Sequence, residues 1–299
     1  MTGRVVSIDG ALLDPARATV SVYDRGFLYG DAVFEVFRTY GGRPFALDDH
    51  LARLRRSAER VYIELPVDDA TLEGEIGAAI AAASGGVEDR REWYLRVIVT
   101  RGSGPLSLDP DTATHPLRVI LVEPVVPPAR DAYARGIALA TATTRRATDG
   151  TTAAGAKVTN YLASLLALRE AHARGAQEAL VVDAAGRVIE GGTSNVFVVK
   201  AGRVATPPES AGILAGITRA HLFQVARAGG MPVEERELTL DDVYGADEVF
   251  ITSSIRELLP VVRVDGRVIG AGVPGPIARS LHRGFREAVG MGDRPMPWE

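Results

Sequence analysis

Hydrophobic residues recur along the chain with two spacings, one typical of helices and one typical of strands. In one stretch, Leu47, Leu51 and Leu54 begin a series spaced by four and three residues, which predicts an amphipathic helix. By this reasoning helices are expected over 47–61, 70–82, 160–174 and 217–227. Alternating or continuous apolar runs predict strands over 5–10, 19–22, 93–100, 117–122, 137–142, 178–183, 196–199 and 248–252.

Predicted strands and helices alternate along the chain, which indicates a mixed α/β fold. The stretch 124–128 is the only proline-dense one between long periodic segments, so we place a domain boundary there. Residues 23–38 combine glycines, charges and aromatics before an alternating run, and we expect a loop followed by a strand. The polar stretch 143–152 is expected to form a loop.

Composition narrows the classes of function. The 299 residues are 46% hydrophobic and 24% charged, as in an ordinary globular protein with a sizeable core. A net charge of −4 argues against a nucleic-acid partner. There is no run of about 18 apolar residues that would predict a membrane helix and no signal-peptide pattern, so we expect a cytoplasmic location. The absence of cysteine excludes disulfides and thiolate chemistry, and no metal site is expected.

Lysine is rare in this chain, and one lysine stands out. Only two of the 34 basic residues are lysines, Lys157 and Lys200. An amine can lose its proton and attack a carbonyl, whereas a guanidinium in a protein cannot. Lys157 lies among small and apolar residues, where desolvation favours the free amine, and this setting suits Schiff-base chemistry. Lys200 lies in a predicted hairpin turn and is expected to be a surface charge. If Lys157 is considered without its neighbours, it can also be interpreted as a surface charge.

The carbonyl partner commonest in proteins for such a lysine is pyridoxal phosphate, which also needs an acid at its pyridine nitrogen and a phosphate cradle. Glu190 precedes two glycines at a strand end, where backbone can approach a ring closely. Thr218 opens a predicted helix, whose unpaired N–H groups and dipole favour a phosphate. Ser253 and Ser254 end a predicted strand and supply donors, and Arg53 can contact phosphate through two nitrogens.

Each of these features taken alone also fits an ordinary turn, helix start or surface arginine. Other phosphate-binding motifs are absent from the sequence, since there is no P-loop and no glycine-rich dinucleotide fingerprint after a strand. The interpretation therefore depends on the combination of features rather than on any one of them.

In combination, these features resemble one known family. The chain is similar to class IV aminotransferases, which are fold-type IV pyridoxal phosphate enzymes. They include branched-chain and D-amino acid aminotransferases, (R)-selective amine transaminases and aminodeoxychorismate lyases. The similarity extends from Asp24 to about Pro260. Seven matching segments occur in the family's order, namely 27–35, 50–54, 96–102 with 108–110, 157–162, 190–197, 216–219, and 252–254 with 260–261.

The resemblance implies an α/β (mixed α+β) enzyme of two domains. A small N-terminal domain (1–122) and a larger C-terminal domain (131–299) are expected, joined by a linker (123–130), with the cofactor between them. A homodimer with active sites near the interface is also implied. Lys157 is expected to form the Schiff base with pyridoxal 5′-phosphate and to move the proton at Cα, and Glu190 to pair with the pyridine nitrogen.

The resemblance also implies further site residues. Those expected at the cofactor are Arg53, Tyr161, Ser194, Asn195, Ile217, Thr218, Ser253 and Ser254. Those expected at the substrate are Tyr29, Phe34, Arg38, Tyr94, Arg96, Ile255 and Arg256. Arg256 admits two interpretations, because its side chain can face the pocket and bind a carboxylate, or can point to solvent or pair with an acid.

The motifs restrict the small-molecule amino donor and the 2-oxo acid acceptor only in part. The pair Phe34–Glu35 and the run 96–102 resemble branched-chain enzymes, so a transaminase of aliphatic amino acids ranks first. Segment 190–195 is closer to D-amino acid aminotransferases and the lyases, so a D-amino acid or (R)-amine transaminase ranks second. A lyase ranks third, because lyases usually carry threonine where Glu35 stands. Val36 and the pair at 255–256 depart from the branched-chain pattern.

Overall fold

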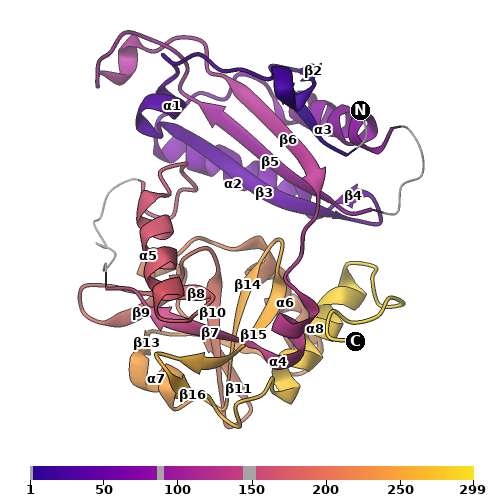
Figure 1. Ribbon diagram of the computed structural model, residues 1–299, viewed down its shortest axis with the longest axis vertical. Coiled ribbons are helices and arrows are strands. Elements are labelled where there is room, and N and C mark those ends of the chain that lie inside the picture. The colour runs from indigo at the N-terminus through magenta and orange to yellow at the C-terminus, as the bar shows by residue number, and fades with distance from the viewer. Residues whose placement is uncertain (1–2, 86–90, 144–152) are drawn as a thin grey trace. The chain divides into compact units, whose positions relative to one another are not determined.

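The computed structural model describes residues 3–85, 91–143 and 153–299 (Figure 1). By their contacts the residues group into two compact units. The N-terminal unit comprises Met1–Val126 together with Ala156–Asn160, and the C-terminal unit comprises Pro127–Gly155 and Tyr161–Glu299. The loop expected over 143–152 lies, apart from its first residue, outside the described residues.

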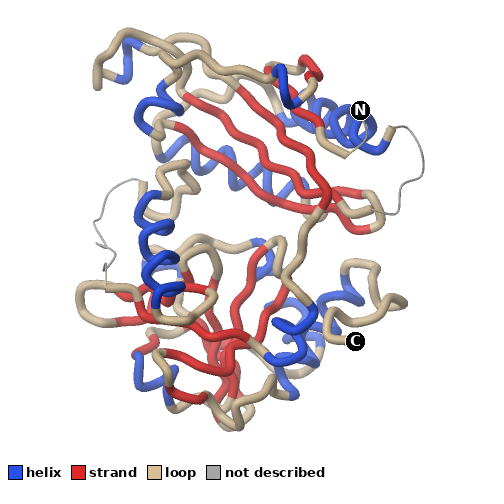
Figure 2. Tube along the Cα trace, in the orientation of Figure 1, coloured by secondary structure: helices blue, strands red, loops and turns tan. Residues whose placement is uncertain are grey.

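An antiparallel sheet is the framework of the N-terminal unit. Its six strands lie in the order β2-β1-β6-β5-β3-β4 and are Val5–Ile8 (β1), Ala11–Leu13 (β2), Ala32–Tyr40 (β3), Arg43–Pro44 (β4), Trp93–Thr100 (β5) and Arg118–Pro124 (β6). The helices are Arg25–Tyr29 (α1), Leu47–Arg60 (α2) and Asp69–Ser84 (α3), with 3₁₀ turns at Pro15–Arg17 and Pro110–Thr112. Helices α2 and α3 cover one face of this sheet (Figure 2).

One face of this sheet is apolar and the other carries polar side chains, because successive side chains of a strand point to opposite faces. Leu95 and Val97 point into the hydrophobic core beneath α2 and α3. Tyr94 and Arg96 alternate with them and lie half-buried on the opposite face. The strand predicted over 93–100 is therefore confirmed, together with the face that its polar side chains share.

The strand predicted over 19–22 is wrong. The place beside β1 is taken by β2, because Asp9 and Gly10 both have positive φ, 48° and 85°, and turn the chain back at once. Val20 and Val22 are exposed instead. An Asp–Gly pair between apolar runs is a strong hairpin signal. The short alternating run over 19–22 has no neighbouring strand with which to pair, so it does not form a strand.

The C-terminal unit is built on a mixed sheet of ten strands. Nine follow the order β12-β11-β10-β14-β15-β7-β8-β9-β13, and β16 pairs with β15. The pairs β11–β12, β7–β15 and β7–β8 are parallel and the others antiparallel. The strands are Ile137–Thr141 (β7), Glu178–Val182 (β8), Arg187–Gly191 (β9), Asn195–Lys200 (β10), Arg203–Thr206 (β11), Val233–Glu235 (β12), Leu238–Thr239 (β13), Glu248–Ser253 (β14), Glu257–Val264 (β15) and Arg267–Val268 (β16).

Helices lie around this second sheet. They are Arg130–Arg135 (α4), Leu162–Ala173 (α5), Ile217–Ala228 (α6), Leu240–Tyr244 (α7) and Pro276–Ala288 (α8), with a 3₁₀ turn at Glu209–Ala211. The four predicted helices are confirmed as α2, α3, α5 and α6. Helix α8 was not predicted, although Pro276 at its first position is a helix-start signal. Among the described residues, no helix has both the length and the apolar character that crossing a membrane requires.

Candidate active site

The segment of Lys157 is held against the edge of β3 that faces away from β5. Its carbonyl accepts a hydrogen bond from Phe34 N at 3.0 Å, and Thr159 N donates to Ala32 O at 2.9 Å. Lys157 N donates to Ser57 Oγ on α2 at 3.1 Å. These bonds explain why this short segment belongs to the N-terminal unit, and they fix the direction in which the lysine side chain leaves the backbone.

The side-chain nitrogen of Lys157 lies over an aromatic ring that also carries an arginine on its face. Its Nζ is 4.6 Å from the centroid of the Phe34 ring, and Cζ of Arg96 is 4.2 Å from the same centroid. Phe34 and Arg96 belong to the face of the sheet opposite α2 and α3. Arg38 and Tyr94 pair with each other across β3 and β5 on that face. The structure thus brings together Lys157, Phe34 and Arg96, with two further expected substrate residues on the same face.

A buried ion pair lies behind this face. Glu35 accepts hydrogen bonds from Nε and Nη2 of Arg53, both at 2.7 Å, and from Nδ1 of His50 at 2.7 Å. Burial alone would raise the pKa of Glu35, but Arg53 and His50 outweigh it and lower the pKa to about 2. Burial lowers the pKa of His50. Arg53, expected at the cofactor phosphate, is therefore fixed in orientation by an acid that is ionised at neutral pH.

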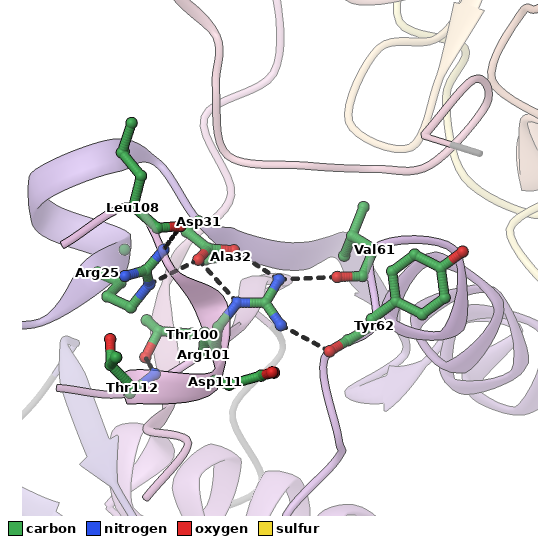
Figure 3. A network of polar contacts seen from close by, with 12 residues as sticks. Arg25, Asp31, Ala32, Val61, Tyr62, Thr100, Arg101, Leu108, Asp111 and Thr112 are labelled. Carbon is green, nitrogen blue, oxygen red and sulfur yellow. Dashed lines mark hydrogen bonds and ion pairs between the residues drawn. The ribbon is translucent and has the colours of Figure 1, made fainter. Parts of the chain in front are cut away.

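A second network anchors the segment that follows Tyr29. Asp31 accepts hydrogen bonds from Nε of Arg25 at 2.9 Å and from Nε of Arg101 at 2.8 Å (Figure 3). Arg101 also donates to the carbonyls just after α2, and Arg25 donates to the carbonyls of 107–109. Burial would raise the pKa of Asp31, but the two arginines outweigh it and lower the pKa. The network ties the turn after α1 to two loops of the same unit.

In the C-terminal unit, Glu190 is buried near the end of β9. Its Oε2 accepts a hydrogen bond from Leu214 N at 3.1 Å, and Asn195 Nδ2 donates to Leu214 O at 2.9 Å. A Cβ on Gly191 would collide with Ser194 Oγ, so glycine is required where the chain turns after Glu190. These contacts place Glu190, Ser194 and Asn195 in one small region.

Helix α6 begins with backbone donors that no side chain caps. Its N-terminal cap residue is Gly216, and a Cβ there would collide with Asn195 Oδ1. The next two residues, Ile217 and Thr218, are buried. The uncapped N–H groups and the helix dipole favour an anion such as a phosphate at this position.

Two buried hydroxyl groups beside Asn195 lack a partner. In the described part of the chain, Ser194 Oγ and Thr252 Oγ1 make no hydrogen bond. Ser194 precedes Asn195, and Thr252 pairs with Asn195 across β10 and β14. Because buried polar groups are normally satisfied, these two hydroxyls indicate a polar group that the polypeptide does not supply.

The turn between β14 and β15 carries the remaining expected residues. Ser253 pairs with Glu257, so 254–256 form a tight connection. Nη1 of Arg256 lies 2.7 Å from Oε2 of Glu178 on β8. Of the two interpretations of Arg256, the structure shows the pairing with an acid, and it leaves the guanidinium partly exposed.

The sequence drew attention to Tyr161 as a site residue but not to Glu178. Tyr161 caps the start of α5 and belongs to the C-terminal unit, whereas Lys157 belongs to the N-terminal one. Glu178 is buried and accepts hydrogen bonds from Thr193 and from its neighbouring backbone N–H. The sequence did contain a signal for Glu178. It is a charged residue at the start of a strand predicted to be buried, and a buried charge needs a partner.

Each unit by itself carries groups that suit one part of a cofactor with an aldehyde, a basic ring nitrogen and a phosphate. The N-terminal unit offers an amine on an aromatic surface. The C-terminal unit offers a buried carboxylate, an uncapped helix start and two unsatisfied hydroxyls. Within the described residues, no group of three or more histidine or acidic side chains is placed to hold a metal ion.

Comparison with known proteins agrees with this chemistry. A family model described as amino-transferase class IV matches residues 32–264. The chain is 38% identical, over 94% of its length and 95% of the relative's, to a Methanocaldococcus jannaschii protein named as a candidate branched-chain-amino-acid aminotransferase. It is 32% identical to the D-alanine aminotransferase of Bacillus licheniformis, over 95% of this chain and 96% of that one. Its fold matches a branched-chain amino acid aminotransferase of T.th., solved with pyridoxamine 5′-phosphate, at TM-score 0.89 and 32% identity, over 99% and 96% of the two chains.

Proposed function

The chain belongs to the class IV aminotransferase family, and we propose that it moves an amino group between an aliphatic amino acid and a 2-oxo acid. The family, the mixed α/β fold and the aminotransferase activity predicted from the sequence are confirmed by these similarities. The pyridoxal phosphate cofactor is confirmed as well, since a solved relative carries its amine form.

The placement of Lys157 is the observation that carries this proposal. When bound, pyridoxal phosphate supplies an aldehyde and a ring that withdraws electrons from the substrate. Lys157 is one of two lysines in the chain, and β3 and Ser57 hold its backbone. We assign to its amine the bond to the aldehyde and, once released, the transfer of the proton at the substrate Cα.

Buried polar groups are proposed to hold the cofactor. The carboxylate of Glu190 is assigned to the pyridine nitrogen, where it favours the protonated ring. The uncapped start of α6 is assigned to the phosphate, because its N–H groups and dipole attract an anion. The other cofactor residues that we propose are Arg53, Tyr161, Ser194, Asn195, Ile217, Thr218, Ser253 and Ser254.

The substrate is proposed to meet both apolar and cationic side chains. Tyr94 offers apolar surface for an aliphatic side chain, and Arg96, which lies over the buried ring of Phe34, offers charge for a carboxylate. The full set of proposed substrate residues is Tyr29, Phe34, Arg38, Tyr94, Arg96, Ile255 and Arg256. The donor and acceptor are both small molecules.

A D-amino acid aminotransferase is the second candidate. Identity of 32% to a D-alanine aminotransferase over most of both chains favours it, and so does the sequence of 190–195. An (R)-amine transaminase and a lyase rank behind these two. All four use the lysine, but the three transaminases differ only in the substrate that they accept, whereas a lyase catalyses a different reaction.

We further propose a homodimer. On α5, Leu162, Leu165 and Leu166 are 64%, 60% and 53% exposed, and their spacing places them on one face of the helix. A second copy that covers this face would remove the leucines from water. Light scattering after size-exclusion chromatography measures the mass, and a monomer at micromolar concentration would contradict the dimer. A cytoplasmic location stays a prediction.

An absorbance spectrum and a donor screen test the proposed function. The purified protein should be yellow, because the cofactor bound to a lysine absorbs visible light. The screen pairs L- and D-amino acids and (R)- and (S)-amines with 2-oxoglutarate or pyruvate, and chiral analysis of the products gives the stereochemistry. A colourless protein that transfers no amino group after incubation with pyridoxal phosphate would refute the proposal.

A further inference from the structure

The β14–β15 turn is closed by a glutamate in a backbone conformation that favours glycine. Glu257 has a φ of 57°, in the left-handed region, and pairs with Ser253 across the turn. Short hairpin connections commonly place glycine at such a position, because a side chain there is strained. A strained residue beside a binding site indicates that its side chain has a task that glycine cannot perform.

The side chain of Glu257 is buried in an ion-paired network. It is 2% exposed, and its Oε2 lies 2.7 Å from Nε2 of His282. Nη1 of Arg286 donates to both carboxylate oxygens, at 3.3 and 3.2 Å. His282 and Arg286 lie one turn apart on α8, so a single helix supplies both partners.

Residues of α4 and of the C-terminal segment make further contacts around the same turn. The Tyr133 hydroxyl on α4 donates to Arg256 O at 3.0 Å, and the Trp298 ring lies 5.3 Å from the ring of His282. Helices α4 and α8 both pack against β15 (Figure 1). Tyr133 therefore holds the turn directly, and Trp298 packs against the histidine that pairs with Glu257.

We propose that Glu257 is a positioning residue whose pairing with His282 and Arg286 holds the β14–β15 turn in its binding shape. This inference rests on the proposed function, which assigns Ser254 of the turn to the phosphate and Arg256 to the substrate. Glu257 acts through the backbone, because its φ sets the direction in which the preceding residues leave β15. Loss of its partners lets the turn relax and moves the groups that the turn carries.

Glu257→Gln tests the proposal. The variant keeps the size of the side chain and removes the charge that faces Arg286. The dissociation constant for pyridoxal phosphate, measured from cofactor released on dilution of the holoenzyme, should rise at least about tenfold, the scale seen when support behind binding groups is removed. At saturating cofactor, KM for the amino donor should rise similarly while kcat changes less than about threefold, because Lys157 is untouched.

Asp265 provides a matched control at the other end of β15. It also has a positive φ, of 49°, and accepts hydrogen bonds from Thr141 N at 2.8 Å and Tyr244 OH at 2.9 Å. It also pairs with Arg174. Asp265→Asn should lower the free energy of unfolding, as Glu257→Gln should, but should leave cofactor affinity and KM at their wild-type values. Affinity therefore separates positioning from a general loss of stability.

A pair of His282 variants keeps the proposal testable if Glu257→Gln does not fold. His282→Gln retains an amide that can donate to Glu257, whereas His282→Leu removes the donor. We expect cofactor affinity near that of the wild type from the first variant and weakened affinity from the second. The difference between them reports the bond to Glu257, since both remove the imidazole.

Wild-type cofactor affinity and KM in Glu257→Gln and His282→Leu would overturn the proposal. An equal loss of affinity in Asp265→Asn would overturn it as well, since the effect would then follow stability alone. A wild-type protein that binds no pyridoxal phosphate and transfers no amino group counts against the proposed function instead. The two failures are therefore distinguishable.

Discussion

Arg256 pairs with Glu178, an acid at the first position of β8, with 2.7 Å between Nη1 and Oε2. The Glu178 side chain is 2% exposed and that of Arg256 is 26% exposed, so the guanidinium reaches from a buried carboxylate toward the surface. Nη1 also donates to Thr193. In the described part of the chain, Nε and Nη2 of Arg256 make no hydrogen bond, and these are the donors that we propose for a substrate carboxylate.

Arg256→Ala should lower kcat/KM for 2-oxoglutarate by about tenfold or more, because a charge-assisted hydrogen bond contributes about 1.5–3 kcal/mol. Turnover of an amine that has no carboxylate, such as 1-phenylethylamine, should not change. Steady-state kinetics with both substrates measure the difference. Arg263→Ala is the control, since it removes an exposed arginine of β15 that donates to Gly266 O. Equal losses on both substrates would restrict Arg256 to a structural role.

Lys157→Ala should abolish amino transfer by several orders of magnitude, because both the nucleophile and the proton carrier are lost. Lys157→Arg should be equally inactive, since a guanidinium keeps the charge but does not give up its proton. Lys200 is the natural control, because it is the other lysine and pairs at the surface with Asp247 at 3.1 Å. Lys200→Ala should turn over like the wild type. Ordinary activity in Lys157→Ala would refute the assignment of this residue.

Glu190→Gln should slow amino transfer by about 10²-fold while the protein still folds and binds pyridoxal phosphate, because only the anion that favours a protonated ring nitrogen is lost. The amide oxygen can still accept the hydrogen bond from Leu214 N. Single-turnover kinetics with the loaded enzyme give the rate, and circular dichroism checks the fold. An unchanged rate would leave Glu190 with a structural role only.

Glu35 should make stability depend on pH in the acidic range. Its pKa in the folded protein is about 2, below the ordinary 4.5, so its contribution is complete above about pH 4.5 and is lost as the pH falls toward 2. The difference between the two pKa values corresponds to about 3 kcal/mol in the free energy of unfolding at neutral pH.

Urea unfolding at a series of pH values tests the role of Glu35. The free energy of unfolding should fall more steeply between pH 4.5 and 2 for the wild type than for Glu35→Gln, which has no carboxylate to protonate. The difference between the two curves removes the contributions of the other acids. Parallel curves would show that Glu35 does not carry the predicted pH dependence.

Local patterns were sufficient where the neighbours of a side chain in space are also its neighbours in the chain. The period of two over 93–100 placed Tyr94 and Arg96 on one face, and the spacing of leucines predicted α2. The strand predicted over 19–22 was wrong because the Asp9–Gly10 turn leads directly into β2, a strand that was not predicted, and makes it the partner of β1. Secondary structure was therefore largely readable from the sequence.

The sequence by itself determined the family and singled out Lys157 as the amine that we propose to react, because rare residue types and the order of motifs are written in the chain. Only the tertiary structure decided that Glu178 is the partner of Arg256 and that His282 is the partner of Glu257. Each of these partners comes from a distant strand or helix. The strength of an ion pair depends on distance and burial, and neither exists until the sheet has paired and α8 has packed against it.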